Sequence, residues 1–177
     1  MNVTVSPGKA HGTIAAPPSK SMAHRLLIAG ALSDGISTIS GISLSKDIEA
    51  TLRCLKAMGA ELAVENNTVR IGNLNPARIP KKTVLDCGES GSTIRFLLPL
   101  CLISGKEVTL TGSPYLLERP MEIYERLCAQ NGIVYRKEAD GIHVKGVLKS
   151  GDYKIPGNVS SQFISGLLFA LPFLPDG

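Results

Sequence analysis

Three short segments of this chain place hydroxyl groups ahead of an apolar stretch. They are Ser19-Lys20-Ser21, Gly91-Ser92-Thr93 and Ser160-Ser161-Gln162. Counted from Ser21 to Ser92 and from Ser92 to Ser161, the intervals are 71 and 69 positions. Each segment is typical of a helix N-terminus, where free backbone N–H groups and the positive end of the helix dipole favour an anion by about 0.3–1 kcal/mol. Binding of small anions is therefore the chemistry that these residues indicate.

The first segment lies in the densest polar motif of the chain, Ala16 to Arg25. Two prolines fix an extended approach, Ser19 or Ser21 can cap the helix, and Lys20 and Arg25 supply two cations. The motif lacks the GxxxxGK[ST] pattern of a nucleotide-binding P-loop. The alternative interpretation is a capped surface helix with two solvated charges.

The second segment follows a strand candidate and contains glycines that let a ligand approach the backbone, with Arg95 one turn into the helix. Arg119 stands just before Pro120, which suits the first position of a following helix, and it could form a bidentate pair with a carboxylate or phosphate. A plain strand-turn-helix junction and a surface arginine are the alternatives.

At the third segment, Ser160, Ser161 and Gln162 can donate hydrogen bonds to phosphate or hydroxyl oxygens without adding charge, and capping needs only one of them. His24 and His143 have no partner pattern for metal binding or nucleophilic catalysis, so we interpret both as structural or surface residues. Cys87 lies beside the second segment, but no neighbouring residue marks it as a thiolate.

Composition narrows the class of protein. The 177 residues carry a net charge of +4 that is scattered along the chain, which disfavours a nucleic-acid-binding arm. The four cysteines show no metal-ligand spacing, so we expect reduced thiols and a cytoplasmic protein. The apolar runs are too short to cross a bilayer. We expect no nucleic-acid partner, no membrane and no metal.

An internal repeat predicts the elements that position the three segments. The helix candidates 47–59 and 120–132 are offset by 73 positions and both end at a glycine, and each is followed by a β-hairpin candidate. Strand candidates are Ser37–Ile42, Lys106–Thr111, Thr83–Asp86 and Asp152–Ile155. The third copy lacks its second half, so we expect a fragment of a longer protein; a two-unit domain that ends at Gly177 is the alternative.

The ordered motifs PPSKSMAHR, GESGSTIR, LERPM and GNVSSQF closely resemble the 5-enolpyruvylshikimate-3-phosphate (EPSP) synthase family. The resemblance implies an α/β (α+β) fold of repeated βαβαββ units, the inside-out α/β barrel of the enolpyruvyl transferases, with the third unit truncated. It also implies that 1–17 is a strand segment of a second lobe. The partial N-terminal lobe would be 18–177, with units at about 18–82, 83–151 and 152–177.

The resemblance further implies transfer of the enolpyruvyl group of phosphoenolpyruvate to the 5-hydroxyl of shikimate 3-phosphate, without metal or cofactor. Lys20 resembles the lysine that contacts both substrates, and Ser21 and Arg25 resemble a pair that holds shikimate 3-phosphate. Gly91 and Arg119 resemble phosphoenolpyruvate contacts. Ser160 and Ser161 resemble the shikimate phosphate clamp, and Gln162 resembles a residue that touches both ligands.

One position departs from the family pattern: Glu89 stands where many relatives have Asn, which places an acid near an anion site. The family's general base belongs to the C-terminal lobe, so we expect no catalytic residue in this chain and no turnover by the chain alone. Two alternatives stay open. One is a UDP-N-acetylglucosamine enolpyruvyl transferase homologue, and the other is a non-catalytic folded fragment with weak anion binding.

Overall fold

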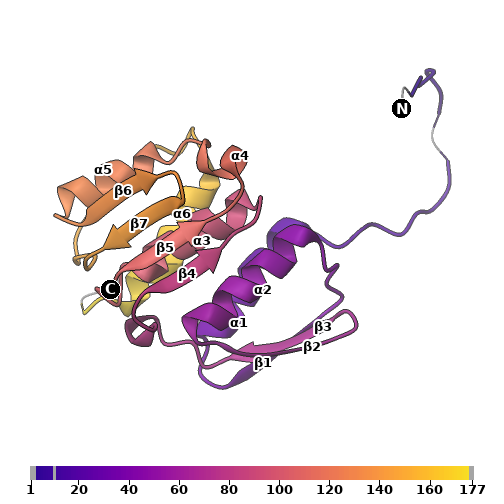
Figure 1. Cartoon of the computed structure of the whole chain (residues 1–177). Coiled ribbons are helices and arrows are strands. Elements are labelled where there is room, and N and C mark those ends of the chain that lie inside the picture. The colour runs from indigo at the N-terminus through magenta and orange to yellow at the C-terminus, as the bar shows by residue number, and fades with distance from the viewer. Residues whose placement is uncertain (1–2, 10, 176–177) are drawn as a thin grey trace.

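The computed structural model describes residues 3–9 and 11–175 and contains two sheets with helices packed against them (Figure 1). The first sheet and its helices comprise α1 (Lys20–Leu32), β1 (Ile36–Ser40), α2 (Lys46–Met58), β2 (Glu61–Glu65) and β3 (Thr68–Gly72). The strand order is β1-β3-β2, with both pairings antiparallel. Helices α1 and α2 pack side by side on this sheet (Figure 1).

The second sheet and its helices follow a similar order, with one more strand and one more short helix. Its elements are β4 (Thr83–Asp86), α3 (Gly91–Cys101), β5 (Val108–Thr111), α4 (Pro114–Leu117), α5 (Glu122–Gln130), β6 (Val134–Glu138) and β7 (Gly141–Lys145). The strand order is β4-β5-β7-β6, in which β4 and β5 are parallel and the other pairs antiparallel. A short 3₁₀ turn, Pro76–Arg78, precedes β4. The mixed α/β fold expected from the sequence is confirmed.

Helix α6 (Ser161–Ala170) packs along α3 and leads into a 3₁₀ turn, Leu171–Phe173. Gly166 permits this contact, because a Cβ there would lie 2.3 Å from the Arg95 carbonyl oxygen. The opposite side of α6 remains open to solvent, with Leu168 64% exposed. Helix α3 is the central element of the core, since nine of its eleven residues are buried.

Local chemistry explains where the elements begin and end. A serine side chain caps α1, α2, α3, α4 and α6, in each case accepting a hydrogen bond from a backbone N–H two or three residues ahead. Helix α2 ends at Gly59 with φ 109°, a left-handed conformation that suits glycine. Both predicted hairpins form, with Asn66 in the left-handed region at the first turn.

Three expectations about elements need correction or remain open. Pro120 does not open a helix, because α5 begins at Glu122; Pro114 takes that role in α4. Residues 152–155 are not a strand, since among the described residues no strand pairs with them. Residues 3–9 and 11–17 are exposed and carry no helix or strand, and the lobe to which they belong stays a prediction.

Part of these expectations falls on positions 1–2, 10 and 176–177, outside the described residues. Across the part of the chain that the structure describes, no helix is both long and apolar enough to cross a membrane.

Candidate anion-binding site

The N-terminus of α1 carries a lysine that is paired within the chain. The Ser19 side chain accepts a hydrogen bond from the Met22 N–H at 3.3 Å, so the cap is Ser19 rather than Ser21. Lys20 Nζ donates to Asp47 Oδ2 of α2 at 2.6 Å. A cavity of about 120 Å³ lies beside this pair and is lined by residues from the starts of α1 and α2, among them Ser19, Lys20 and Ser45.

Arg25 connects α1 to α6. Its Nη1 donates to the Ser21 carbonyl at 3.0 Å and its Nη2 to Ser165 Oγ at 3.2 Å. The guanidinium also lies 5.0 Å from the centre of the Phe96 ring, a cation–π geometry. The predicted site residue Arg25 is thus fixed between α1 and α6.

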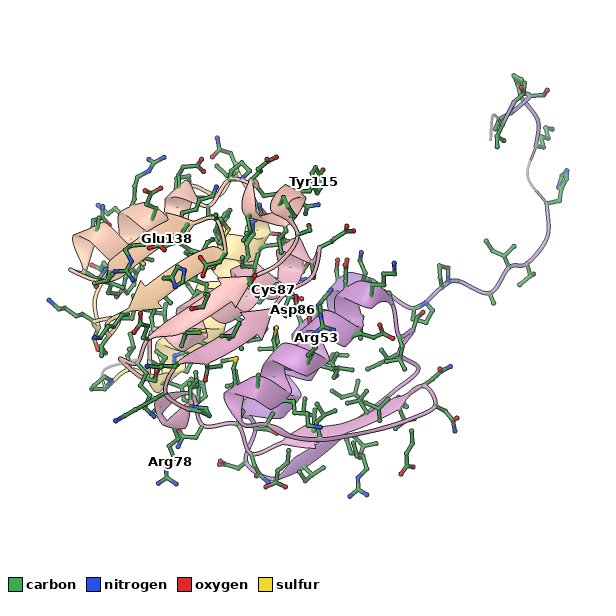
Figure 2. All side chains as sticks on the ribbon, in the orientation of Figure 1. Arg53, Arg78, Asp86, Cys87, Tyr115 and Glu138 are labelled. Carbon is green, nitrogen blue, oxygen red and sulfur yellow. The ribbon has the colours of Figure 1, made fainter. Side chains whose placement is uncertain are left out.

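At the N-terminus of α3, two guanidiniums converge on Gly91. A Cβ added at Gly91 would lie 2.6 Å from Arg119 Nη1 and 3.2 Å from Arg95 Nη1. Arg119 also lies over the ring of Tyr115, which Figure 2 shows at the outer side of α4, with 5.0 Å between guanidinium carbon and ring centre. The absence of a side chain at Gly91 therefore lets both guanidiniums lie close to the start of α3.

The second and third N-termini are joined through Gln162. Arg95 Nη1 donates to Gln162 Oε1 at 2.9 Å, and Gln162 Nε2 donates to Ser92 Oγ at 2.8 Å. Arg95 Nη2 also donates to the Pro120 carbonyl at 3.3 Å, which fixes the loop that carries Arg119. We call this set, Arg95 with Ser92, Gln162 and Pro120, the α3–α6 junction.

The electrostatics of the α3–α6 junction favour an anion. Burial, and next the positive charge of Arg119, lower the pKa of Arg95. Among residues 3–9 and 11–175 no carboxylate lies within 4.0 Å of either guanidinium. Two like charges in a partly dehydrated place repel each other, and a bound anion would relieve that repulsion.

A second set of polar side chains, all buried, joins α1, α2 and α3. His24 Nδ1 lies 2.8 Å from Thr51 Oγ1, and Thr51 Oγ1 lies 2.7 Å from Thr93 Oγ1. The Thr93 hydroxyl donates to Ser90 Oγ at 2.7 Å. We call these four residues the α1–α3 junction. His24 is the structural residue that the sequence indicates, and burial lowers its pKa to about 4, so the ring is neutral at pH 7.

The remaining predicted residues lie at the same helix starts. Ser160 caps α6 by accepting a hydrogen bond from the Gln162 N–H at 3.2 Å. Ser21 and Ser161 are exposed and free for other contacts, and Glu89 is exposed on the turn before Ser90. All eight predicted site residues therefore lie at or beside the joined N-termini of α1, α3 and α6; that they bind a ligand stays a prediction.

Sequence reasoning missed Asp47 and Thr51, because neither belongs to a motif. An acidic residue in the first turn of a helix is common for reasons of the helix dipole alone, so Asp47 carried no signal of a lysine partner 27 positions away. Ser92 lay within a recognised segment, but its partner Gln162 is 70 positions distant.

We interpret the cysteines as core residues rather than nucleophiles. All four are buried. A hydrogen bond with Cys54 and burial raise the pKa of the Cys87 thiol well above its ordinary value, and burial raises that of Cys128 to about 12. A thiol that stays protonated at neutral pH is a poor nucleophile and metal ligand.

Two other features lie apart from the joined N-termini. Ligand atoms of Glu138, Asp140 and His143 come within 4.8 Å of one another at the β6–β7 turn. They already bond locally, since His143 Nε2 is 2.9 Å from Asp140 Oδ1, so we interpret them as a surface turn. A hollow of about 490 Å³ lies between α5 and residues 150–156, and none of the predicted site residues lines it.

Comparisons with known proteins find one family that this chain matches along nearly its whole length. The family model described as EPSP synthase (3-phosphoshikimate 1-carboxyvinyltransferase) matches residues 5–177. A 3-phosphoshikimate 1-carboxyvinyltransferase of Clostridium perfringens (strain SM101 / Type A) is 44% identical over 98% of this chain and 42% of its own length. One from Clostridium kluyveri is 45% identical over 97% of this chain and 41% of its length.

Solved structures agree. An EPSP synthase from Acinetobacter baumannii superposes with a TM-score of 0.76 at 27% identity, covering 90% of this chain and 37% of that one. The chain thus spans about two fifths of the length of the relatives that it matches. Because the family model matches nearly every residue, including all of the predicted site residues, this chain belongs to the EPSP synthase family.

Proposed function

We propose that this chain supplies the N-terminal share of a site that transfers the enolpyruvyl group of phosphoenolpyruvate to the 5-hydroxyl of shikimate 3-phosphate, with release of phosphate. The observation that carries the proposal is the pair of guanidiniums, Arg119 and Arg95, that converge on Gly91 at the start of α3. Both substrates are polyanions. An anion between these cations would form charge-assisted hydrogen bonds, which are stronger than neutral ones.

The residue roles are those that the family resemblance implies, and the geometry of the three N-termini is compatible with them. Gly91 and Arg119 would bind phosphoenolpyruvate, because the missing Cβ lets the Arg119 guanidinium come close to the start of α3, and Arg119 has no carboxylate partner among the described residues. Ser160, Ser161 and the α6 dipole would hold the phosphate of shikimate 3-phosphate, together with Ser21 and Arg25. Lys20 at the start of α1 and Gln162, which bonds Arg95 and Ser92, would contact both ligands.

We further propose that the chain alone binds but does not turn over. It spans about two fifths of its relatives' length. The family resemblance implies that the general base belongs to the part that this chain does not cover. We propose that residues 1–17 belong to a second lobe. The four free, buried thiols support a reducing, cytoplasmic location.

Two measurements test the proposal. Calorimetry should detect shikimate 3-phosphate binding to the isolated chain in about the millimolar range. A phosphate-release assay with both substrates should show no turnover. Phosphate release by the chain would refute its proposed inactivity. If neither substrate binds, the assignment of the N-termini as substrate-binding groups is refuted.

Matched variants assign the roles. Lys20→Gln should weaken binding of both ligands, whereas Arg119→Gln should weaken phosphoenolpyruvate selectively, each by about tenfold. Lys145→Gln, which removes an exposed cation from β7, is the control and should change neither affinity. Equal losses in all three variants would indicate nonspecific attraction to net charge.

A further inference from the structure

The α1–α3 junction is a continuous line of polar groups inside the core. His24, Thr51 and Thr93 are 0% exposed and Ser90 is 1% exposed. Each residue comes from a different position in the fold: His24 from α1, Thr51 from α2, Thr93 from α3 and Ser90 from its cap. Buried polar groups of this kind must satisfy one another, because no water reaches them.

The hydrogen atoms of this line can be ordered. The Thr93 hydroxyl donates to Ser90 Oγ at 2.7 Å, so its oxygen can only accept from Thr51, which lies 2.7 Å away. That uses the single hydrogen of the Thr51 hydroxyl. The only other acceptor near both hydroxyls among the described residues, the Asp47 carbonyl, is farther from each, at 3.3 and 3.5 Å.

With its hydrogen committed to Thr93, Thr51 must accept the next hydrogen bond rather than donate it. Its partner is His24 Nδ1 at 2.8 Å, so Nδ1 must carry the ring hydrogen. His24 Nε2 is buried without a hydrogen-bond partner. In the Nδ1–H tautomer, Nε2 carries only a lone pair, which costs less when unpaired. In the other tautomer Nε2 would carry a buried N–H without an acceptor, which is rare in proteins.

We propose that Thr51 is a positioning residue at the centre of a hydrogen-bond chain in which every donor points the same way, from His24 through Thr51 and Thr93 to Ser90. This chain fixes His24 as the Nδ1–H tautomer. It also holds the N-termini of α1 and α3 in a fixed position relative to each other. The chain reaches both candidate anion-binding helix starts. His24 follows Lys20 by one turn of α1, and Ser90 precedes Gly91 directly. Its consequence for ligand binding rests on the proposed function; the tautomer and the helix positions do not.

The first test needs no substitution. Nitrogen-15 NMR of the chain separates the two neutral tautomers of histidine, and His24→Asn identifies the His24 signals among three histidines. We expect the Nδ1–H form. Thr51→Val keeps the side-chain shape and removes the hydroxyl, so the Nδ1–H loses its acceptor and the Nε2–H form should gain population. An Nε2–H tautomer in the unsubstituted chain would overturn the proposal.

The second test follows the helix starts by amide hydrogen exchange. The Ala23 N–H bonds to the Ser19 carbonyl and the Ile94 N–H to the Ser90 carbonyl, so both report the first turn of a helix. Thr51→Val should speed exchange at both by about tenfold, and Thr51→Ser, which keeps the hydroxyl, should restore it to within about twofold. Thr38→Val on the exposed side of β1 is the matched control. Unchanged exchange in Thr51→Val would refute the positioning role.

The third test measures the effect of Thr51 on the binding of shikimate 3-phosphate. Calorimetry with shikimate 3-phosphate should show about a tenfold loss of affinity in Thr51→Val and about the original affinity in Thr51→Ser. Equal affinity in Thr51→Val and the unsubstituted chain would refute the effect on binding. If the unsubstituted chain binds no shikimate 3-phosphate, the proposed function fails, while the tautomer and exchange results still decide the hydrogen-bond chain.

Discussion

The α1–α3 junction and the α3–α6 junction hold neighbouring helix N-termini by different chemistry. In the first, three hydroxyls and one neutral imidazole meet inside the core, and the nearby charges of Lys20 and Asp47 pair with each other. In the second, the Arg95 guanidinium crosses from α3 to α6 and lies next to Arg119.

The difference assigns separate tasks to the two junctions. A neutral, buried network fixes geometry without attracting ions, but it fails when its imidazole must accept a proton. An arginine stays charged over the whole working pH range, so the α3–α6 junction keeps its positive charge for an anion. At Gly91 two guanidiniums therefore lie together without a carboxylate partner among the described residues, whereas Lys20 of α1 is already paired with Asp47.

The largest expected effect is a loss of folding stability at acid pH, caused by protonation of His24 in the α1–α3 junction. Burial, and next the charges of Asp47, Lys20 and Arg25, set the pKa of His24 at about 4 in the folded chain, against 6.5 unfolded. Because the folded pKa is lowered, its contribution to stability is complete above pH 6.5 and is lost as pH falls toward 4. The loss should reach about 3 kcal/mol.

Urea unfolding between pH 7 and 4 measures this loss. In His24→Asn the amide replaces the imidazole and has no proton to gain, so the slope of stability against pH in this range should shrink. The same slope in both chains would show that other groups cause the acid sensitivity.

Removing the guanidinium of the α3–α6 junction should be the next largest effect. Arg95→Ala removes hydrogen bonds to Gln162 and Pro120 and the contact with the Phe163 ring, so unfolding free energy should fall by about 2 kcal/mol. Arg53→Ala is the matched control. Arg53 also bonds a carbonyl and a carboxylate, those of Asp86, but on the surface, where Figure 2 shows the two residues side by side. Its loss should stay below about 1 kcal/mol.

Filling the space at Gly91 should change ligand affinity more than stability. The new methyl group of Gly91→Ala would lie 2.6 Å from Arg119 Nη1, the flexible end of a side chain that can move away. Phosphoenolpyruvate affinity should fall by about tenfold while the urea midpoint changes little. Gly8→Ala adds a methyl group with no atom within 4 Å and should change neither. A large loss of stability in Gly91→Ala would show that Arg119 is held rigidly instead.

The smallest expected effect on stability is that of breaking the ion pair between Lys20 and Asp47. Asp47→Asn breaks an ion pair whose lysine side chain is 55% exposed, so stability should fall by less than about 1 kcal/mol and the loss should shrink in high salt. Glu49→Gln removes another first-turn acid that has no lysine partner among the described residues and isolates the helix-dipole contribution. Equal salt dependence in the two variants would mean that the Lys20 pair adds nothing.

The sequence by itself determined the local structure. The helix starts near Gly91 and Ser160, the glycine end of α2 and both hairpins depend on residues a few positions apart, so motif and periodicity were sufficient to predict them. The linear motifs were also sufficient to predict the family, and the comparisons confirm that prediction.

Only the tertiary structure decided how these local pieces meet. Residues 152–155 have strand-forming composition but no partner strand among the described residues, so composition alone predicted them wrongly. The partner of Lys20, the joining of Ser92 to Gln162 and the order of the α1–α3 junction all link residues 27 to 70 positions apart. Such contacts leave no local pattern in a single sequence, because each depends on how whole helices pack.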